Sequence, residues 1–202
     1  MKMDFEIQEK IVCYQGFFRL EQYRLRHQKF NGEWSRPITR EIFERGNAAA
    51  VLPYDPHTDE ILLIEQFRAG AVFAPGTPWL LEIVAGVIEA NETPEQVVVR
   101  ESVEEAGCQI SNLIPLYDYL VSPGGTTERI MLFCGQIDMQ TISTGSVHGN
   151  GEEDEDIKVH ITPLNEAIRL LNTGRISSAS AIIALQWLAL NRDSVRHRWL
   201  SE

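Results

Sequence analysis

The alternation of apolar and polar residues predicts a small β-sheet at the start of the chain. Phe18 and Leu20 alternate with polar neighbours, which is the two-residue period of a half-buried strand. Asn31-Gly32 follows, and this pair predicts a type I′ turn between two strands. We therefore expect residues 1–45 to form a separate antiparallel sheet, which is too small to be stable alone and must pack on another surface.

Residues 46–202 mix strand and helix patterns without the regular strand–helix–strand rhythm of a parallel sheet. This mixture predicts an α+β domain built on a mixed sheet. Short apolar runs predict the strands, and apolar residues at helical spacing predict the helices. The expected strands cover 48–52, 61–64, 79–84, 116–120, 130–133 and 157–161, and the expected helices cover 94–106, 163–173 and 177–191.

The first of these helices has the clearest signals at both ends. Thr93 is a good N-cap, and Pro94 suits the first helical position. Gln96 completes a capping box, and Gly107 stops the helix. An apolar stripe is expected to pack on the sheet, and it consists of Val99, Val103 and Ala106. Three carboxylates share another face because they are three and four positions apart, namely Glu101, Glu104 and Glu105.

Composition narrows the functional class. The net charge of −11 argues against a protein that coats nucleic acid, because that task needs a basic surface. No apolar run approaches the roughly 20 residues of a membrane span, and the first ten residues do not resemble a secretory signal. The three cysteines are too far apart for a zinc pair and are expected to be free thiols. We therefore expect a cytoplasmic protein without nucleic-acid or membrane partners.

The three glutamates on one helix face have two interpretations. Charge runs are usually solvated, and this acidic face taken alone favours that interpretation. Like charges at this spacing also repel one another, and a divalent cation such as Mg²⁺ or Mn²⁺ reverses that cost by binding between the carboxylates. The residues around the helix decide between the two.

The segment from Gly86 to Cys108 favours the metal site. Five residues separate Gly86 from Glu92, seven separate Glu92 from Arg100, and the run that starts at Arg100 reads RESVEEAGC. This pattern resembles the Nudix box, the loop–helix–loop signature of the Nudix hydrolase superfamily. Ser102 and Cys108 depart from it, at positions where the pattern prefers an aliphatic residue. The resemblance implies the Nudix fold, an α+β mixed β-sheet sandwiched by helices, here with the small antiparallel N-terminal β-sheet.

The resemblance also implies a role for each box residue. Glu101 and Glu105 would be the main ligands of Mg²⁺ or Mn²⁺ and so act in catalysis. Glu104 would be a further ligand, and the backbone carbonyl of Ala85 would complete the site. The Glu92–Arg100 pair would fix the loop against the helix, because an arginine can clamp a carboxylate with two parallel hydrogen bonds.

Beyond the box, the chain resembles the bacterial ADP-ribose pyrophosphatases. The matching segments include 64–68, 79–82, 122–128 and 153–157. This resemblance implies a metal-dependent pyrophosphohydrolase that converts water and ADP-ribose to AMP and ribose 5-phosphate. GDP-mannose hydrolases are close relatives, so GDP-mannose or another nucleoside diphosphate sugar is the alternative substrate. A non-catalytic Nudix-fold ligand sensor is an alternative of a different class, although such sensors typically lose box carboxylates that this chain keeps.

An acidic loop at 151–156 again has two interpretations. Taken alone, it is a flexible and solvated loop. The resemblance implies that Glu153 acts as general base on the attacking water and that Glu155 is a metal ligand. This assignment stays open by one or two positions along the loop.

The resemblance further implies substrate-binding residues and a dimer. Arg40 and Arg68 would bind phosphate or ribose, Phe17 would stack on the adenine, and Glu128 would lie near the ligand. Surface ion pairs for the arginines and a core position for Phe17 are the alternatives. Because the related enzymes are dimers with exchanged N-terminal segments, we expect a homodimer. Residues 1–45 would then serve dimerisation and substrate binding, and 46–202 would form the Nudix hydrolase domain.

Overall fold

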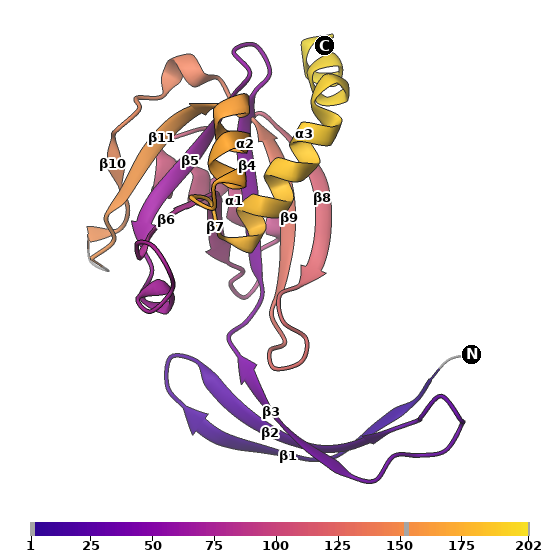
Figure 1. Cartoon of the computed structure of the whole chain (residues 1–202). Coiled ribbons are helices and arrows are strands. Elements are labelled where there is room, and N and C mark those ends of the chain that lie inside the picture. Colours follow the sequence, from indigo (N-terminus) through magenta and orange to yellow (C-terminus); the bar gives the residue numbers. More distant parts are fainter. Residues whose placement is uncertain (1–2, 152–153, 202) are drawn as a thin grey trace. The chain divides into compact units, whose positions relative to one another are not determined.

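The computed structural model describes residues 3–151 and 154–201, and the chain forms two compact units (Figure 1). The first unit comprises Met1–Asn47 and Leu120–Arg129. The second comprises Ala48–Tyr119 and Ile130–Glu202.

The first unit contains a three-stranded antiparallel sheet of order β1-β2-β3. Its strands are β1 (Phe5–Gln15), β2 (Arg19–His27) and β3 (Ile38–Glu44). All residues of β1 are exposed, including several large apolar side chains. The small antiparallel N-terminal sheet is therefore confirmed, and its apolar surface is left uncovered within the described chain.

The turn between β2 and β3 differs from the predicted type I′. That turn needs a positive φ at both central residues, but Gly32 has a φ of 87° whereas Asn31 is not among the described residues with positive φ. The N–H of Gly32 donates to the carbonyl of Lys29 at 2.8 Å. The side-chain oxygen of Asn31 instead accepts the N–H of Glu33 at 3.0 Å. This local hydrogen bond lets the turn close with only the glycine in the left-handed region.

The second unit is built on an eight-stranded mixed sheet with the order β10-β11-β5-β4-β9-β8, to which β6 is added beside β5 and β7 beside β4. The pairing of β4 with β9 is parallel, and β4 and β5 are antiparallel. The strands are β4 (Ala48–Asp55), β5 (Glu60–Phe67), β6 (Trp79–Glu82), β7 (Val84–Val87), β8 (Asn112–Leu120), β9 (Arg129–Gln136), β10 (Val147–His148) and β11 (Ile157–Pro163).

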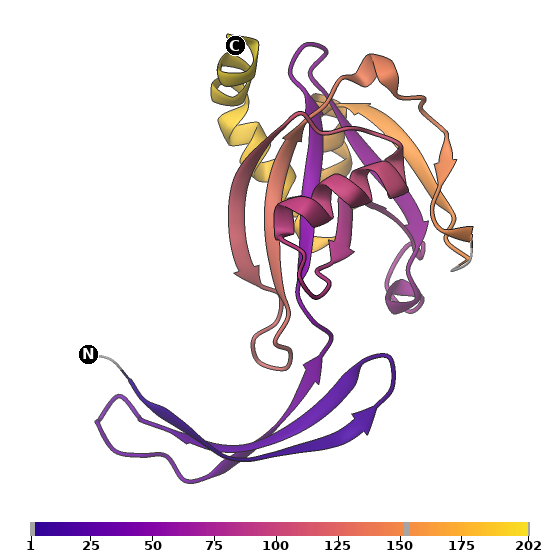
Figure 2. The same ribbon diagram turned by 180° about the vertical axis from the view of Figure 1, so that it is seen from behind.

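Helices cover both faces of this sheet (Figures 1 and 2). Helix α1 (Pro94–Ala106) packs on one face, and α2 (Leu164–Asn172) and α3 (Ala179–Leu200) pack on the other. Two short 3-10 helices lie in the loops, η1 (Ala69–Ala71) and η2 (Met139–Thr141). The predicted α+β sheet sandwiched by helices is confirmed.

Strand β4 supplies both cores because its side chains alternate between the two faces. Leu52 and Tyr54 belong to the cluster formed with α2 and α3, whereas Val51 belongs to the cluster formed with α1. Every residue of β4 is buried, which fits its central place in the sheet.

Helix α3 is longer than its sequence pattern predicted. The apolar pattern predicts an end near residue 191, but the helix continues to Leu200. Val195 and Trp199 are buried in the same core, and the Trp199 ring lies 6.3 Å from that of Tyr54. Isolated apolar residues among polar ones do not predict a helix, and here tertiary packing extends it.

An ion pair fastens this extension to the turn after β4. Arg192 donates two hydrogen bonds of 2.8 Å to the carboxylate of Asp59, and the hydroxyl of Tyr54 donates a third at 2.8 Å. Burial raises the pKa of Asp59, but these hydrogen bonds and the charge of Arg196 outweigh it, so the pKa is lowered. The ionised form of Asp59 therefore stabilises the fold.

Within the described residues, no helix is long and apolar enough to span a membrane. All three cysteines are free thiols, as predicted, with Cys13 exposed and Cys108 and Cys134 buried.

We predict that Asp59→Asn lowers the free energy of unfolding at pH 7 by roughly 1–3 kcal/mol, because it removes a charged hydrogen-bond acceptor. Asparagine tolerates the positive φ of 61° at this position. Because the pKa of Asp59 is lowered on folding, its stabilisation is present above the ordinary carboxyl pKa and is lost as pH falls through the lowered value. Denaturant unfolding at several pH values should show that the difference in the free energy of unfolding between wild type and Asp59→Asn becomes smaller as the pH falls.

The control is Asp193→Asn, since Asp193 is exposed and lies 3.7 Å from the same arginine. It should change stability little at any pH. A gap between wild type and Asp59→Asn that stays constant down to pH 2 would contradict the prediction.

Candidate active site

Helix α1 begins and ends as its sequence predicts. The Thr93 hydroxyl accepts the N–H of Gln96 at 3.3 Å, and the Gln96 side chain accepts the N–H of Thr93 at 2.8 Å. Gly107 adopts the left-handed conformation with a φ of 60° at the C-terminal end. These caps fix the length of the helix and hence the positions of its glutamates.

The face that α1 buries is different from the predicted one. Val99 and Val103 are exposed, while Glu105 is only 6% exposed. The buried side of the helix consists of Val97, Val98, Ser102, Glu105 and Ala106. The helix therefore turns carboxylates rather than two of its valines toward the sheet, although burying a charge is costly unless it is compensated.

Burial strongly perturbs Glu105. Desolvation raises its pKa to about 8, and the nearby charge of Glu101 adds to this effect. The backbone N–H of Ala85 partly opposes the shift by donating to the Glu105 carboxylate at 3.1 Å. Burial also raises the pKa of Glu101, with contributions from Glu104 and Glu155. A buried Glu105 and a half-buried Glu101, both with a raised pKa, are characteristic of a functional site rather than of a solvated helix face.

Gly86 lets the helix approach the sheet at this point. A Cβ atom at residue 86 would lie 2.0 Å from the Glu101 carboxylate oxygen. Gly86 lies on β7, opposite Ala49 of β4, so the strand itself is held in place. Any side chain here would displace the carboxylate of Glu101, which explains the glycine at the first box position.

Arg100 connects the box loop to the glutamates. It binds Glu92 through two nitrogens, at 3.0 and 3.1 Å, which confirms the predicted pair. Its Nη1 also donates to Glu101 at 2.7 Å and to Glu104 at 3.0 Å. The hydrogen bond from Arg100 lowers the pKa of Glu92.

Arg68 supplies positive charge from the sheet. It follows β5, and its Nε donates to Glu82 of β6 at 2.6 Å. Its charge acts on Glu105, whose pKa it lowers in part. Sequence reasoning identified Arg68 but missed Glu82. A carboxylate at the end of the otherwise apolar strand 79–82 was the available signal.

The acidic loop contributes charge to the same cluster. Glu155 is exposed, accepts the N–H of Asn150 at 3.1 Å, and raises the pKa of Glu101 and Glu105. Glu153 lies outside the described residues.

The remaining predicted residues belong to the first unit. Arg40 is exposed on β3 and donates to the carbonyl of Thr39 at 2.7 Å. Phe17 is 93% exposed, so it is not a core residue. Glu128 is buried, and Arg45 lies 3.5 Å from its carboxylate.

The donor set fits a divalent cation. Among the described residues, no three or more His, Cys, Asp or Glu side chains are grouped closely enough to hold a metal ion, and Arg100 binds Glu101 and Glu104 instead. Nevertheless, Glu105 is buried, Glu101 is half-buried, and the charge of Glu101 raises the pKa of Glu105 further, so a cation bound between them would stabilise both carboxylates. Hard oxygen ligands of this kind suit Mg²⁺ or Mn²⁺.

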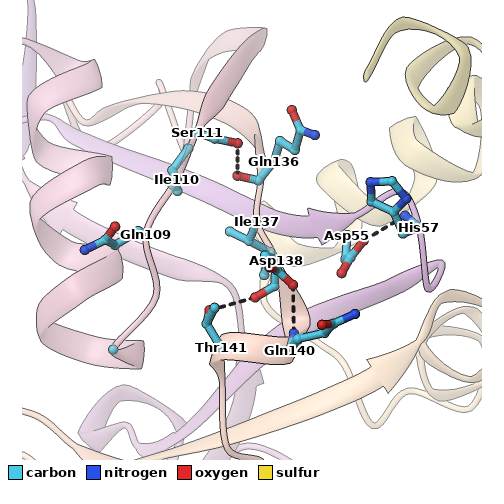
Figure 3. Close-up of a pocket in the computed structure, with 11 residues that line it drawn as sticks. Asp55, His57, Gln109, Ile110, Ser111, Gln136, Ile137, Asp138, Gln140 and Thr141 are labelled. Atoms are coloured by element: carbon cyan, nitrogen blue, oxygen red, sulfur yellow. Dashed lines mark hydrogen bonds between the residues drawn. The ribbon is translucent and has the colours of Figure 1, made fainter. Parts of the chain in front are cut away.

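A separate pocket of about 770 Å³ lies at the C-terminal end of α1 (Figure 3). None of the predicted site residues lines it. Its polar groups already bind one another: Ser111 donates to the carbonyl of Gln136 at 3.2 Å, and Thr141 donates to that of Asp138 at 2.8 Å. The buried carboxylate of Asp55 accepts the N–H of His57 at 2.7 Å. This pocket is therefore distinct from the glutamate cluster.

Comparison with known proteins gives near full-length matches. The chain is 46% identical over 198 residues to the ADP-ribose pyrophosphatase of Escherichia coli (strain K12), which covers 98% of this chain and 94% of that protein. It is 42% identical to the ADP-ribose pyrophosphatase of Haemophilus influenzae, over 98% of this chain and 92% of that protein. Identity to the GDP-mannose pyrophosphatase of Pectobacterium atrosepticum is 35%, over 92% and 94% of the two chains.

The fold and the family agree with these matches. A solved ADP compounds hydrolase superposes with a TM-score of 0.68 over 93% of this chain and 95% of that one, at 20% sequence identity. The family model of the NUDIX domain matches residues 44–185, which include the box, Arg68 and the acidic loop. The chain belongs to the NUDIX domain family.

Proposed function

We propose that this protein hydrolyses ADP-ribose to AMP and ribose 5-phosphate in the cytoplasm. The observation that carries the proposal is the buried Glu105 carboxylate of the Nudix box, on which the charges of Glu101 and Arg68 act. The higher identity to ADP-ribose pyrophosphatases than to GDP-mannose pyrophosphatases supports the substrate. Three free cysteines suit a reducing compartment.

Magnesium, or manganese in its place, is the proposed cofactor. Glu101 and Glu105 would be its main ligands, with Glu104, Glu155 and the carbonyl of Ala85 completing the set. The bound cation would neutralise the diphosphate and stabilise charge that develops on its oxygens. The raised pKa of Glu105 supports this assignment, because a carboxylate that is costly to ionise in the free protein is stabilised by a cation.

The chain's own residues would carry the proton transfer and the positioning. Glu153 would accept a proton from water as the water oxygen attacks one phosphorus. The P–O bond to the bridging oxygen would break, and that oxygen would leave on the other phosphate. Arg68 would hold the diphosphate, since a guanidinium binds phosphate oxygens in pairs. Arg40, Phe17 and Glu128 of the first unit are the proposed contacts to the nucleoside and the terminal ribose.

We predict that substitutions of the helix glutamates and of the loop glutamate change kcat and KM differently. Glu105→Gln and Glu101→Gln should each lower kcat by about 10² or more, and Glu104→Gln should lower it less, since Glu104 is exposed. Glu153→Gln should lower kcat by about 10²–10⁴ with KM near the wild-type value, because a general base acts in the transition state. Steady-state kinetics with Mg²⁺ and with excess chelator would measure this.

Glu95→Gln is the matched control, because Glu95 is exposed on the same helix. It should retain near-normal turnover. Normal turnover in Glu105→Gln, or full activity in chelator, would exclude the proposed metal site. A loss that follows Glu152 or Glu155 instead of Glu153 would move the base along the loop.

We predict that ADP-ribose is the preferred substrate in a panel with GDP-mannose, NADH and nucleoside triphosphates. A diphosphate flanked by two bulky groups needs contacts on both sides, and stacking on Phe17 alone cannot choose adenine over guanine. Chromatography of the products and kcat/KM at equal Mg²⁺ would measure the preference. A value for GDP-mannose tenfold above that for ADP-ribose would transfer the chain to that substrate. Binding without turnover of any substrate would favour a ligand sensor.

A homodimer with exchanged N-terminal segments is the proposed assembly, with residues 1–45 serving dimerisation and substrate binding and 46–202 serving hydrolysis. The support is the uncovered apolar surface of β1, because a three-stranded sheet cannot bury its own apolar side chains. The exposed apolar residues on this strand are Phe5, Ile7, Ile11, Val12 and Tyr14.

We predict that wild type has twice the chain mass by light scattering at micromolar concentration and that Ile11→Asp shifts it toward monomer, because a charge would be buried in the interface. Leu190→Asp is the control, since Leu190 is exposed on α3. It should leave the dimer intact. A wild-type monomer with full activity would contradict the proposed assembly.

A further inference from the structure

The side-chain amide of Gln66 on β5 contains a buried hydrogen-bond donor that no described residue accepts. Its side chain is only 6% exposed, and its Nε2 has no hydrogen-bond partner among the residues that the structure describes. Leaving a buried polar group unsatisfied costs roughly 1–3 kcal/mol. An apolar side chain of similar shape would avoid this cost, so the amide calls for a partner that is not part of the described chain.

The alternation along β5 places Gln66 on the face that carries α1. Ile64 packs in the same cluster as Val97 and Val98 of α1, whereas Leu63 packs in the cluster on the opposite face. Because side chains two apart point to the same side of a strand, Gln66 shares the face of Ile64. Arg68, whose charge reaches Glu105, follows two positions later.

The Arg68–Glu82 ion pair spans the position of Gln66. On β6, Glu82 lies opposite Ile64 and Leu80 lies opposite Gln66. Along β5, Arg68 lies two residues after Gln66, whereas Glu82 lies level with Ile64, two residues before Gln66. Nevertheless, Nε of Arg68 donates to the Glu82 carboxylate at 2.6 Å. The ion pair therefore spans the stretch of β5 that carries Gln66, which places a phosphate-binding cation near the unsatisfied amide.

The acidic loop approaches the same point from the other edge of β5. Lys158 of β11 lies opposite Glu65, and the strands are antiparallel, so the chain that leads back from β11 into the loop runs past Gln66. The charge of Glu155 on that loop acts on both Glu101 and Glu105. Gln66 thus lies on the strand between the box glutamates and the loop acids.

We propose that Gln66 is a substrate-binding residue whose Nε2 donates a hydrogen bond to a non-bridging oxygen of the diphosphate, beside Arg68. An amide N–H₂ donates to an oxygen acceptor and cannot coordinate a cation, and the positive charge of Arg68 on the same face favours an anionic acceptor. A neutral donor next to Arg68 adds a directed hydrogen bond without adding charge. The proposal rests on the hydrolysis of a nucleoside diphosphate sugar proposed above.

The test is Gln66→Met, which keeps the length of the side chain and removes the donor. If the amide has no partner in the free protein, its removal leaves the unfolding temperature unchanged or raises it. Affinity for a methylene-bridged analogue of ADP-ribose, measured by calorimetry with Mg²⁺, should fall about tenfold. KM for ADP-ribose should rise to a similar extent while kcat stays within about twofold, since the bond forms on binding.

Leu80→Met is the matched control, because Leu80 lies opposite Gln66 on β6 and has no donor to lose. It should bind the analogue as wild type does. Equal affinity of Gln66→Met and wild type would overturn the proposal. So would an unfolding temperature that falls well below that of Leu80→Met, because the amide would then have a structural partner. A wild type that neither binds the analogue nor cleaves ADP-ribose would instead refute the proposed function itself.

Discussion

The burial of the Glu105 carboxylate on α1 is the constraint on which the rest of the site depends. A carboxylate with a pKa raised to about 8 is unfavourable in its ionised form, and an isolated helix would turn it to solvent. The packing of Val97, Val98 and Ala106 in the core holds the helix in the opposite orientation, with Glu105 turned toward the sheet. The N–H of Ala85 then meets the carboxylate, and Gly86 leaves room for its neighbour Glu101.

Two arginines, each held in place by an ion pair, act on the carboxylates of Glu101 and Glu105. Arg100 is held by Glu92 on the side of the box loop, and Arg68 is held by Glu82 on the side of the sheet. In each case a carboxylate outside the cluster fixes a guanidinium whose charge acts on the cluster. Because both guanidiniums are already held in place, less conformational entropy is lost in ordering them when an anionic ligand binds. The two faces of the sheet thus have different roles. The face with α1 carries the carboxylates, whereas the face with α2 and α3 is a core closed by the Asp59–Arg192 pair.

The comparisons cover both the fold and nearly the whole length of the chain. At 20% identity the solved ADP compounds hydrolase shares the fold, while the relatives at 46% and 42% identity extend over nearly the whole chain, including the N-terminal sheet. Substrate choice depends on hydrogen bonds to the base and the ribose, which backbone similarity does not determine. The unsatisfied amide of Gln66 is assigned to the diphosphate, which all nucleoside diphosphate sugars share, so it bears on affinity rather than on this choice.

The local features could be predicted from the amino-acid sequence: the caps of α1, the spacing of its glutamates, the Glu92–Arg100 pair and the family. Each depends on residues close in sequence, where capping and helical periodicity act directly. The folded structure was needed to see which face of α1 is buried, with Glu105 inside and Val103 outside, and that α3 continues to Leu200. It also showed that Arg68 bonds to Glu82, fourteen residues away. These outcomes depend on long-range packing, in which the summed contacts of a core outweigh the preference of a single side chain.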